Sequence, residues 1–367
     1  MKRVTSWYSN KVKGTIPKGC QLCSLGSKVV LFITGTCDSN CFYCPLSKEK
    51  RNDIIFANEK QIHSISEAFE EAEMISALGA GITGGDPSSN IDRTVEYISK
   101  LKEKFGKAFH CHLYTSYSLN QTDLKTLHSS GLDEIRFHPP RLQLNEEMKN
   151  SITIAKTFSW DVGFEIPVIP DKEKEIQTII DFAESTKLDF VNLNELEITE
   201  ENLLIMNKLG FHTKTDVSAA VKGSEELALA ILKNNTSKTV TLHYCSSSYK
   251  DRIQLRNRLK RRAKNFAIPS DEITEDGLLV RARIIIRDSE GLTKVANMLI
   301  KNFGVPEELV EIDEEKVMIY TNWKVAQKYS DDMVNKFRGE IIAIQVIHQY
   351  PHENGIITYL DPIFEKK

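Results

Sequence analysis

The chain has 367 residues, which at about 150 residues per domain predicts two or three domains. Apolar residues make up 41% and charged residues 27%, a composition typical of globular proteins that excludes the disordered and fibrous classes. The 48 basic and 51 acidic residues give a net charge of −3, which argues against a protein that binds a polyanion over most of its surface. No stretch approaches the roughly 18 apolar residues of a membrane span, and the N-terminus lacks the apolar core of a secretory signal. We therefore expect a cytoplasmic protein without a membrane partner.

Strand-forming runs alternate with helical stretches from residue 28 onwards. The β-branched run Lys28–Thr34 ends at a glycine, which predicts the first strand. Further strands are predicted at Ala80–Thr83, Phe109–Thr115, Glu134–His138, Val162–Ile169, Phe190–Leu193 and Thr239–His243. Helices are predicted at Glu59–Leu78, Ile91–Phe105, Leu124–Ser129 and Lys174–Ser185. This alternation predicts βα units and a parallel sheet in an α/β fold.

The cysteines are odd in number, and five of the seven lie between positions 20 and 44. Without an export signal, this distribution favours metal or redox chemistry over a disulfide framework. Cys37, Cys41 and Cys44 form a CxxxCxxC motif. Three thiolates on one short loop suit an iron–sulfur cluster, in which each sulfur binds a different iron and one iron stays open. The alternative is a zinc site completed by a histidine, although structural zinc usually uses paired CxxC motifs.

A second motif, Gly81-Ile-Thr-Gly84-Gly85-Asp86-Pro87, ends the next predicted strand. Together with CxxxCxxC and with Tyr43 just before its last cysteine, it resembles the radical S-adenosylmethionine (radical SAM) superfamily, which carries a GGEP-type motif at this place. Asp86 stands where glutamate is more usual. The resemblance covers roughly residues 28–245 and is nearest to a largely archaeal group related to pyruvate formate-lyase-activating enzymes.

The resemblance implies a partial (β/α)6 TIM-like barrel with its site at the C-terminal ends of the strands. It also implies that Cys37, Cys41 and Cys44 hold a 4Fe-4S cluster whose open iron chelates S-adenosylmethionine (SAM). A low-potential donor of ferredoxin or flavodoxin type would supply one electron, and the resulting 5′-deoxyadenosyl radical would abstract a substrate hydrogen. The residues expected to bind SAM are Tyr43, Gly84, Gly85, Asp86, Ser116 and Asn192.

Polar residues alternate with apolar ones along the later strands. In a helix-wrapped barrel the apolar faces pack against helices, so the polar faces are expected to line the cavity. We predict Arg136, Glu165 and His138 as catalytic candidates, with Arg136 first because its fork suits a carboxylate or phosphate. The alternative for each residue is an ordinary hydrogen-bonding role.

A CxxC motif at Cys20 and Cys23 precedes the barrel, and Cys245 follows its last predicted strand. The first and last strands of a barrel bring these regions together. Cys20, Cys23 and Cys245, with His243 as a further ligand, would then form an auxiliary iron–sulfur cluster or a structural zinc site. The alternative is a set of reduced, packed thiols, as we expect for Cys111 on the apolar face of its strand.

The C-terminal third begins with a basic helix, Tyr249–Phe266, which is either a solvated connector or a contact for a phosphate backbone. The following strands and helices have the order βαββαβ, which predicts a ferredoxin-like α+β domain. These elements are Leu278–Arg287, Glu290–Phe303, Leu309–Ile312, Lys316–Thr321, Trp323–Phe337 and Glu340–His348, with an added strand at Gly355–Tyr359. The predicted divisions are an N-terminal CxxC segment (1–27), the barrel (28–246), a basic connector (247–270) and the C-terminal domain (271–367).

The leading functional hypothesis is a radical SAM enzyme that modifies a macromolecule, with RNA preferred because of the basic helix. The first alternative is an activase that generates a radical on a partner protein. Radical modification of a small molecule or peptide is a further alternative. A non-enzymatic iron–sulfur or zinc module is disfavoured by the intact Gly84-Gly85-Asp86-Pro87 motif.

Overall fold

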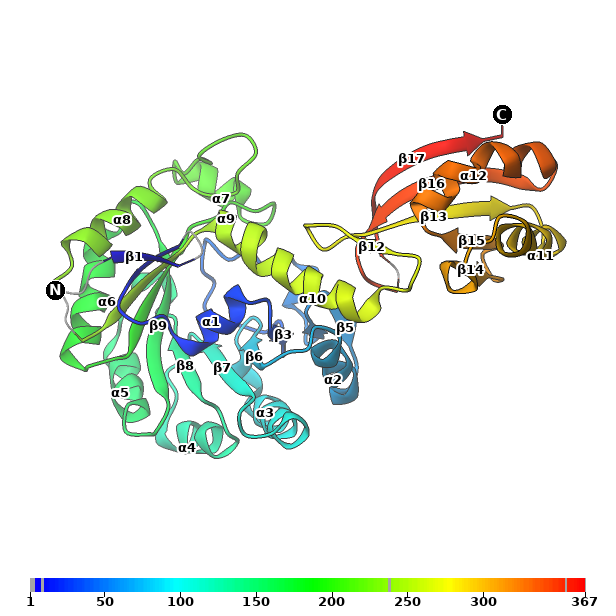
Figure 1. Ribbon diagram of the computed structural model, residues 1–367. Coiled ribbons are helices and arrows are strands. Elements are labelled where there is room, and N and C mark those ends of the chain that lie inside the picture. The colour runs from blue at the N-terminus through cyan, green and yellow to red at the C-terminus, as the bar shows by residue number, and fades with distance from the viewer. Residues whose placement is uncertain (1–3, 8–9, 237–238, 354, 367) are drawn as a thin grey trace. The chain divides into compact units, whose positions relative to one another are not determined.

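A computed structural model describes residues 4–7, 10–236, 239–353 and 355–366 (Figure 1). Its contacts divide the chain into two compact units, Met1–Leu255 and Arg256–Lys367. Across the described ranges, no helix combines the length and the apolar character needed to cross a membrane.

The N-terminal unit is built on an 11-stranded sheet with the order β1-β2-β11-β10-β9-β8-β7-β6-β3-β4-β5. From β3 to β11 every neighbouring pair along β3-β6-β7-β8-β9-β10-β11 is parallel, as the alternating sequence pattern predicts. These strands are β3 (Lys28–Phe32), β6 (Gly79–Thr83), β7 (His110–Thr115), β8 (Glu134–Phe137), β9 (Asp161–Val168), β10 (Phe190–Glu195) and β11 (Thr241–Cys245). Antiparallel strands extend both edges, namely β1 (Val4–Trp7), β2 (Asn10–Lys13), β4 (Ile55–Ala57) and β5 (Lys60–Ile62).

Helices cover the outer face of the curved sheet (Figure 1). They are α2 (Ile65–Met74), α3 (Ile91–Phe105), α4 (Gln121–Ser129), α5 (Glu146–Ala155), α6 (Glu173–Ser185), α7 (Leu203–Lys208) and α8 (Ser224–Asn234). Short turns of helix occupy Glu49–Arg51, Pro87–Asn90, Pro140–Leu142 and Ser247–Tyr249. Helix α1 (Lys18–Ser24) differs from these, because it lies inside the curve of the sheet against β3, β6 and β7.

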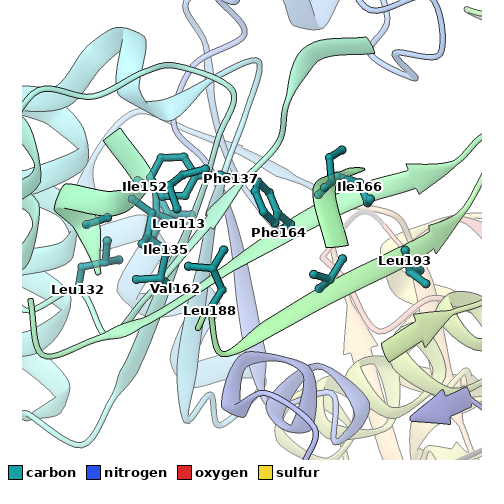
Figure 2. Close-up of a cluster of buried hydrophobic side chains, with 14 of the residues drawn as sticks. Leu113, Leu132, Ile135, Phe137, Ile152, Val162, Phe164, Ile166, Leu188 and Leu193 are labelled. Carbon is teal, nitrogen blue, oxygen red and sulfur yellow. The ribbon is translucent and has the colours of Figure 1, made fainter. Parts of the chain in front are cut away.

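The apolar faces of the strands form the core between sheet and helices. Figure 2 shows Ile135 and Phe137 of β8 beside Val162 and Phe164 of β9, with Ile152 of α5 close by. All five side chains are fully buried. Cys111 is also fully buried, as expected for a residue on the apolar face of β7. Because the odd-numbered positions of β8 face the helices, Glu134 and Arg136 point into the curve of the sheet.

The prediction of one helix over Glu59–Leu78 is wrong at both ends, because α2 covers only Ile65–Met74. The hairpin β4–β5 occupies residues 55–62, and α2 begins only after Ser64. The Ser64 hydroxyl accepts a hydrogen bond from the backbone N–H of Glu67, and the Glu67 carboxylate accepts one from that of Ser64. This capping box satisfies two backbone donors and fixes the start of the helix.

The C-terminal unit contains a sheet with the order β14-β15-β13-β16-β17, with β12 (Glu272–Ile273) paired to β13. All its pairs are antiparallel. Its elements in chain order are β13 (Leu279–Ile286), α11 (Ser289–Asn297) with a π-helical extension Met298–Asn302, the turn Glu307–Leu309, β14 (Val310–Asp313), β15 (Met318–Thr321), α12 (Trp323–Lys336), β16 (Ile341–Gln349) and β17 (Ile357–Glu365). A separate apolar core lies between this sheet and its two helices. The added strand is longer than predicted, because β17 runs six residues beyond Tyr359.

The basic stretch 249–266 is helical but not uniformly so. Residues Lys250–Leu255 form a π-helical segment and Arg256–Phe266 form α10. The division between the two compact units falls between these segments.

Candidate functional site

A cavity of about 520 Å³ opens at the C-terminal ends of the parallel strands. Its wall includes the Cys37–Cys44 loop after β3, the Gly84–Pro87 loop after β6 and the ends of β7, β8, β9 and β10. Loops that follow neighbouring parallel strands meet at the same edge, so motifs that are distant in sequence converge here. Of the predicted site residues, the cavity wall includes Cys23, Cys37, Cys41, Tyr43, Cys44, Gly84, Gly85, Asp86, Ser116, His138 and Glu165.

The three thiols of the CxxxCxxC loop have few protein partners. The sulfur of Cys37 accepts a hydrogen bond from the backbone N–H of Ser39 at 3.5 Å and lies 3.9 Å from the hydroxyl of Ser116. Cys41 lies 3.9 Å from the carbonyl oxygen of Ser39, and all three thiols are half-buried. Burial, and after it the nearby thiols Cys37 and Cys44, raise the pKa of Cys41. Three thiols on one short loop whose sulfurs make few contacts are suited to bind a group that comes from outside the chain.

The donor set of the CxxxCxxC loop fits an iron–sulfur cluster. Within the described residues, no group of three or more His, Cys, Asp or Glu side chains is arranged to hold one ion. A cubane does not need such convergence, because each thiolate binds a different iron. The donor set and the adjoining cavity therefore agree with the cluster that the motif predicts.

The glycines of the second motif allow two loops to approach each other closely. A Cβ atom on Gly85 would lie 2.4 Å from the carbonyl oxygen of Gly35 and 2.5 Å from that of Thr36. Gly84 has a φ of +159°, and its Cβ would lie 2.3 Å from the carbonyl oxygen of Thr34. The backbone N–H groups of Gly85 and Asp86 donate to the carbonyl oxygens of Thr34 and Thr36, both at 2.8 Å. The second motif is thus bonded directly to the segment that leads into Cys37.

The Asp86 carboxylate is used inside the protein. It accepts hydrogen bonds from the backbone N–H of Ser88 at 2.9 Å, the hydroxyl of Thr115 at 3.1 Å, and both the N–H and the hydroxyl of Ser116. Burial raises its pKa, while the bonds from Ser116 act in the opposite direction. Its side chain therefore anchors the loop after β6 to the end of β7.

Tyr43 and His138 form a pair on the wall of the cavity. The Tyr43 hydroxyl lies 3.0 Å from His138 Nε2 and accepts a hydrogen bond from the backbone N–H of Arg141 at 3.0 Å. His138 Nδ1 lies 2.9 Å from the carbonyl oxygen of Glu165, which places the proton on Nδ1 when the ring is neutral. Burial lowers the pKa of His138. The neutral ring can then accept a hydrogen bond from the Tyr43 hydroxyl at Nε2, which fixes the orientation of the tyrosine ring on the cavity wall.

Arg136 lies beneath the cavity and is only 2% exposed. Its guanidinium is ion-paired with Glu134 and with Glu165, the latter at 3.0 Å, and donates to the Tyr114 hydroxyl at 3.2 Å. Burial would raise the pKa of Glu165, but Arg136 and the amides of Asn192 and Asn194 hold it below its usual range. The fork of Arg136 is therefore filled by the protein's own carboxylates rather than left open to a ligand.

Asn192 is also part of this buried network. Its amide nitrogen donates to the Glu165 carboxylate at 2.7 Å, and its oxygen lies 3.1 Å from His243 Nδ1. Asn192 is outside the cavity wall, whereas Asn194, two residues further along β10, is part of it. The alternation along β10 predicted the correct face of the strand, but the cavity wall begins at Asn194, two residues beyond the predicted Asn192.

The thiols of the predicted second metal site have different environments. Cys20 is buried, and its sulfur accepts hydrogen bonds from Arg136 and Asn192, both at 3.4 Å. Burial raises the pKa of Cys20 to about 12. Cys245 is buried and accepts from Gln254 at 3.7 Å, whereas Cys23 lies on the cavity wall. A second metal site formed by these thiols stays a prediction.

Comparison with known proteins decides the family. The profile of the radical SAM superfamily matches residues 31–140, a range that includes the three thiols and both glycines of the second motif. A protein of Methanocaldococcus jannaschii named "Putative glycyl-radical enzyme activating enzyme" is 45% identical over 296 residues, which are 78% of each chain. The chain belongs to the radical SAM superfamily. It is an enzyme, and membership implies an iron–sulfur cluster and SAM as its cofactors.

The similar solved structures have much lower sequence identity to this chain. Streptococcus suis SuiB bound to S-adenosylmethionine is 11% identical with a TM-score of 0.41, and the alignment covers 60% of this chain and 50% of SuiB. Methylornithine synthase (PylB) is 13% identical with a TM-score of 0.40, over 59% of this chain and 70% of that one. In the C-terminal unit, residues 277–363 match a domain of unknown function (DUF8061).

Several residues of the cavity wall escaped the sequence analysis. Among them are Lys28, the first residue of β3, and Lys250. The predicted basic helix Tyr249–Phe266 included Lys250 but gave it no place in the site. Lys250 in fact pairs with Glu197 at 2.6 Å. Strand alternation would have found Lys28, because it lies on the same face of β3 as Val30, another wall residue. Lys250 carried no comparable signal, since its partner Glu197 is 53 residues away in the chain.

Proposed function

We propose that this radical SAM enzyme is an activase that generates a radical on a partner protein, most simply at a glycine Cα. The observation that carries the proposal is the 45% identity, over 78% of both chains, to a relative named for glycyl-radical enzyme activation. The name of that relative suggests a protein substrate. RNA, the first choice from the sequence, is supported only by the basic helix.

Cys37, Cys41 and Cys44 would hold the proposed 4Fe-4S cluster, beside the cavity that would take SAM. When bound, the two cofactors would supply the reductive radical chemistry that removes a hydrogen atom from the substrate. Gly84 and Gly85 keep the loop after β6 against the cysteine loop, and Tyr43 and Ser116 contribute wall beside the thiols. A low-potential protein of ferredoxin or flavodoxin type is the proposed electron donor.

Arg136 is proposed as a positioning residue. It holds the Glu165 carboxylate in its ionised form, and Glu165 in turn binds Asn192 and Asn194. His138 is proposed to orient Tyr43 rather than to react with substrate. Glu165 stays the best candidate for direct contact with substrate, because its side chain is part of the cavity wall.

Strand order supports two proposals about the fold. Six βα units, from β3–α2 to β10–α8, are followed by a seventh parallel strand, β11, and they support a partial (β/α)6 TIM-like barrel within residues 28–246. In the C-terminal unit, the order β14-β15-β13-β16 is the order expected of a ferredoxin-like βαββαβ domain over residues 271–367.

The activase proposal is tested by transfer of hydrogen from glycine. The reconstituted full chain is incubated anaerobically with SAM, dithionite and a heptapeptide whose central glycine carries deuterium at Cα. Deuterium in the 5′-deoxyadenosine and an organic radical on the peptide in electron paramagnetic resonance are the expected results. Unlabelled peptide and total cellular RNA are the controls. Deuterium-free 5′-deoxyadenosine from the peptide, together with modified RNA, would reverse the order of the two hypotheses.

A further inference from the structure

The charged groups on the cavity wall are unequally paired. Its carboxylates are all satisfied within the protein: Glu165 by Arg136, Glu195 by Lys214, Glu197 by Lys250, and Asp86 by its four donors. Lys28 and Arg51 are the wall cations for which the described part of the chain provides no carboxylate partner. Arg51 is exposed at the rim, whereas Lys28 is only 6% exposed.

Lys28 has donors to spare. Its ammonium group carries three N–H donors, and its hydrogen bond among the described residues is to His112 Nε2 at 2.9 Å. Burial, and after it the charges of Lys28 and Arg136, hold the pKa of His112 well below its usual value, so the ring is neutral and accepts at Nε2. A buried ammonium group that lacks an anionic partner is costly, because it has lost most of its water.

The surroundings of Lys28 leave room above it. A Cβ atom on Gly81 would lie 3.3 Å from Lys28 Nζ and 3.0 Å from His112 Nε2, so the glycine keeps this part of the cavity open. Helix α1 closes the lumen below, where Gly19 leaves no space for a Cβ beside Arg136 and His112. A ligand can therefore approach Lys28 only from the cavity.

The depth of Lys28 separates it from the expected cofactor position. Gly81 precedes Gly84 by three residues in β6 and the loop that follows, which corresponds to about 10 Å along an extended chain. Lys28 reaches the level of Gly81, well below the loop that contacts the cysteine segment. The space between these levels is where a substrate would lie.

We propose that Lys28 forms a binding site for a carboxylate group of the substrate at the floor of this cavity. The inference rests on the proposed function only in taking this cavity as the substrate site. The carboxylate belongs either to an acidic side chain of a peptide segment or to a small free acid. The Tyr114 hydroxyl, 3.1 Å from His112 Nε2 and part of the cavity wall, lies beside the same ring.

The test measures carboxylate binding directly. Saturation-transfer NMR on the full chain gives dissociation constants for acetate, for the capped peptide acetyl-Gly-Glu-Gly-amide and for its neutral counterpart acetyl-Gly-Gln-Gly-amide. In the wild type we expect acetate or the Glu peptide to bind and the Gln peptide to bind about tenfold more weakly or not at all. Lys28→Met should weaken carboxylate binding about tenfold or more, and Lys28→Arg should retain it. Tighter binding of the Glu peptide identifies an acidic side chain as the source, and tighter binding of acetate a small acid.

Matched variants and a cofactor arm locate the site. Arg51→Met removes the rim cation and should leave the carboxylate affinities unchanged. Equal affinities in the wild type and Lys28→Met, or a loss in Arg51→Met instead, would overturn the proposal. It would also be overturned if Lys28→Met weakened SAM binding to the reconstituted protein by the same factor, since Lys28 would then belong to the cofactor. If Lys28→Met does not fold, the wild type alone tests the proposal, and equal affinities for the Glu and Gln peptides would overturn it. None of these binding results depends on radical transfer, so failure of the activase proposal remains separately visible.

Discussion

Two sets of polar groups face the lumen of the N-terminal unit, and they differ in how their bonding capacity is used. Below the cavity, the buried residues Glu134, Arg136 and Asn192 form a network with Glu165, whose side chain also reaches the cavity wall. At the C-terminal edge of the strands, Cys37, Cys41 and Cys44 have only long or weak contacts with the protein. A satisfied network contributes rigidity, whereas groups with unused capacity are available to a ligand. We therefore predict that substitutions at the edge abolish the reaction, whereas substitutions in the buried network lower the free energy of unfolding.

The largest effect is expected at the edge. Cys41→Ala should abolish site-specific iron binding and the formation of 5′-deoxyadenosine, because the remaining two thiols cannot hold the cluster. Iron and sulfide analysis after anaerobic reconstitution, with product detection by chromatography, measures both effects. The control is Cys111→Ala, which removes a thiol buried in the core of the sheet. Retained SAM cleavage in Cys41→Ala would refute the assignment of the cluster.

In the buried network, Arg136→Met should cost about 3–5 kcal/mol of unfolding free energy, because it leaves the buried Glu134 carboxylate and the Glu165 carboxylate without their cation. Urea unfolding of the two-unit chain, monitored by tryptophan fluorescence and by circular dichroism, measures the change. The exposed pair Lys100–Glu103 provides the comparison, and Lys100→Met should cost less than about 0.5 kcal/mol. Similar costs for the two variants would show that the ion pairs of Arg136 stabilise the fold no more than an exposed surface ion pair does.

Gly85→Ala tests whether the two loops at the edge need close backbone contact. Its Cβ would overlap with the carbonyl oxygens of Gly35 and Thr36, so the loops must separate at a cost of about 1–3 kcal/mol. We expect weaker SAM binding in the reconstituted protein, measured by equilibrium dialysis. Gly339→Ala, at a position where a Cβ would meet no atom within 4 Å, is the matched control. Unchanged SAM affinity in Gly85→Ala would mean that the loops tolerate separation.

The smallest effect concerns the pH dependence of stability. His112 packs among Lys28, His110, Tyr114 and Arg136. Burial, and after it the charges of Lys28, Arg136 and His110, lower its pKa well below 6.5, the value taken for the unfolded chain. As the pH falls below that value, the unfolded chain gains a proton that the folded chain does not, so stability is complete above it and decreases below it.

In His112→Gln, the slope of unfolding free energy against pH on the acid side should decrease by up to about 1.4 kcal/mol per pH unit. Urea unfolding at a series of pH values gives the slope. His63→Gln removes an exposed histidine and serves as the control. An unchanged acid-side slope in His112→Gln would show that this ring is not held neutral by the fold.

The sequence alone determined the chemistry and most of the architecture. Cysteine spacing and the Gly84-Gly85-Asp86-Pro87 motif are local patterns, so they identified the radical SAM superfamily, which the comparisons confirm. Apolar and β-branched runs predicted the parallel strands, because burial against helices acts on each strand separately. The error at residues 59–64 arose because a helical pattern does not reveal the strand partners of β5, which lie in β4.

Only the tertiary structure decided which polar residues face a ligand and which face one another. Arg136 and Asn192 lie on the predicted face of their strands, but their partners Glu165, Cys20 and His243 come from distant parts of the chain. Lys28 differs from them because no carboxylate of the described chain reaches it. Whether a buried charge is satisfied depends on long-range packing, and the spacing of residues in a sequence does not contain that information.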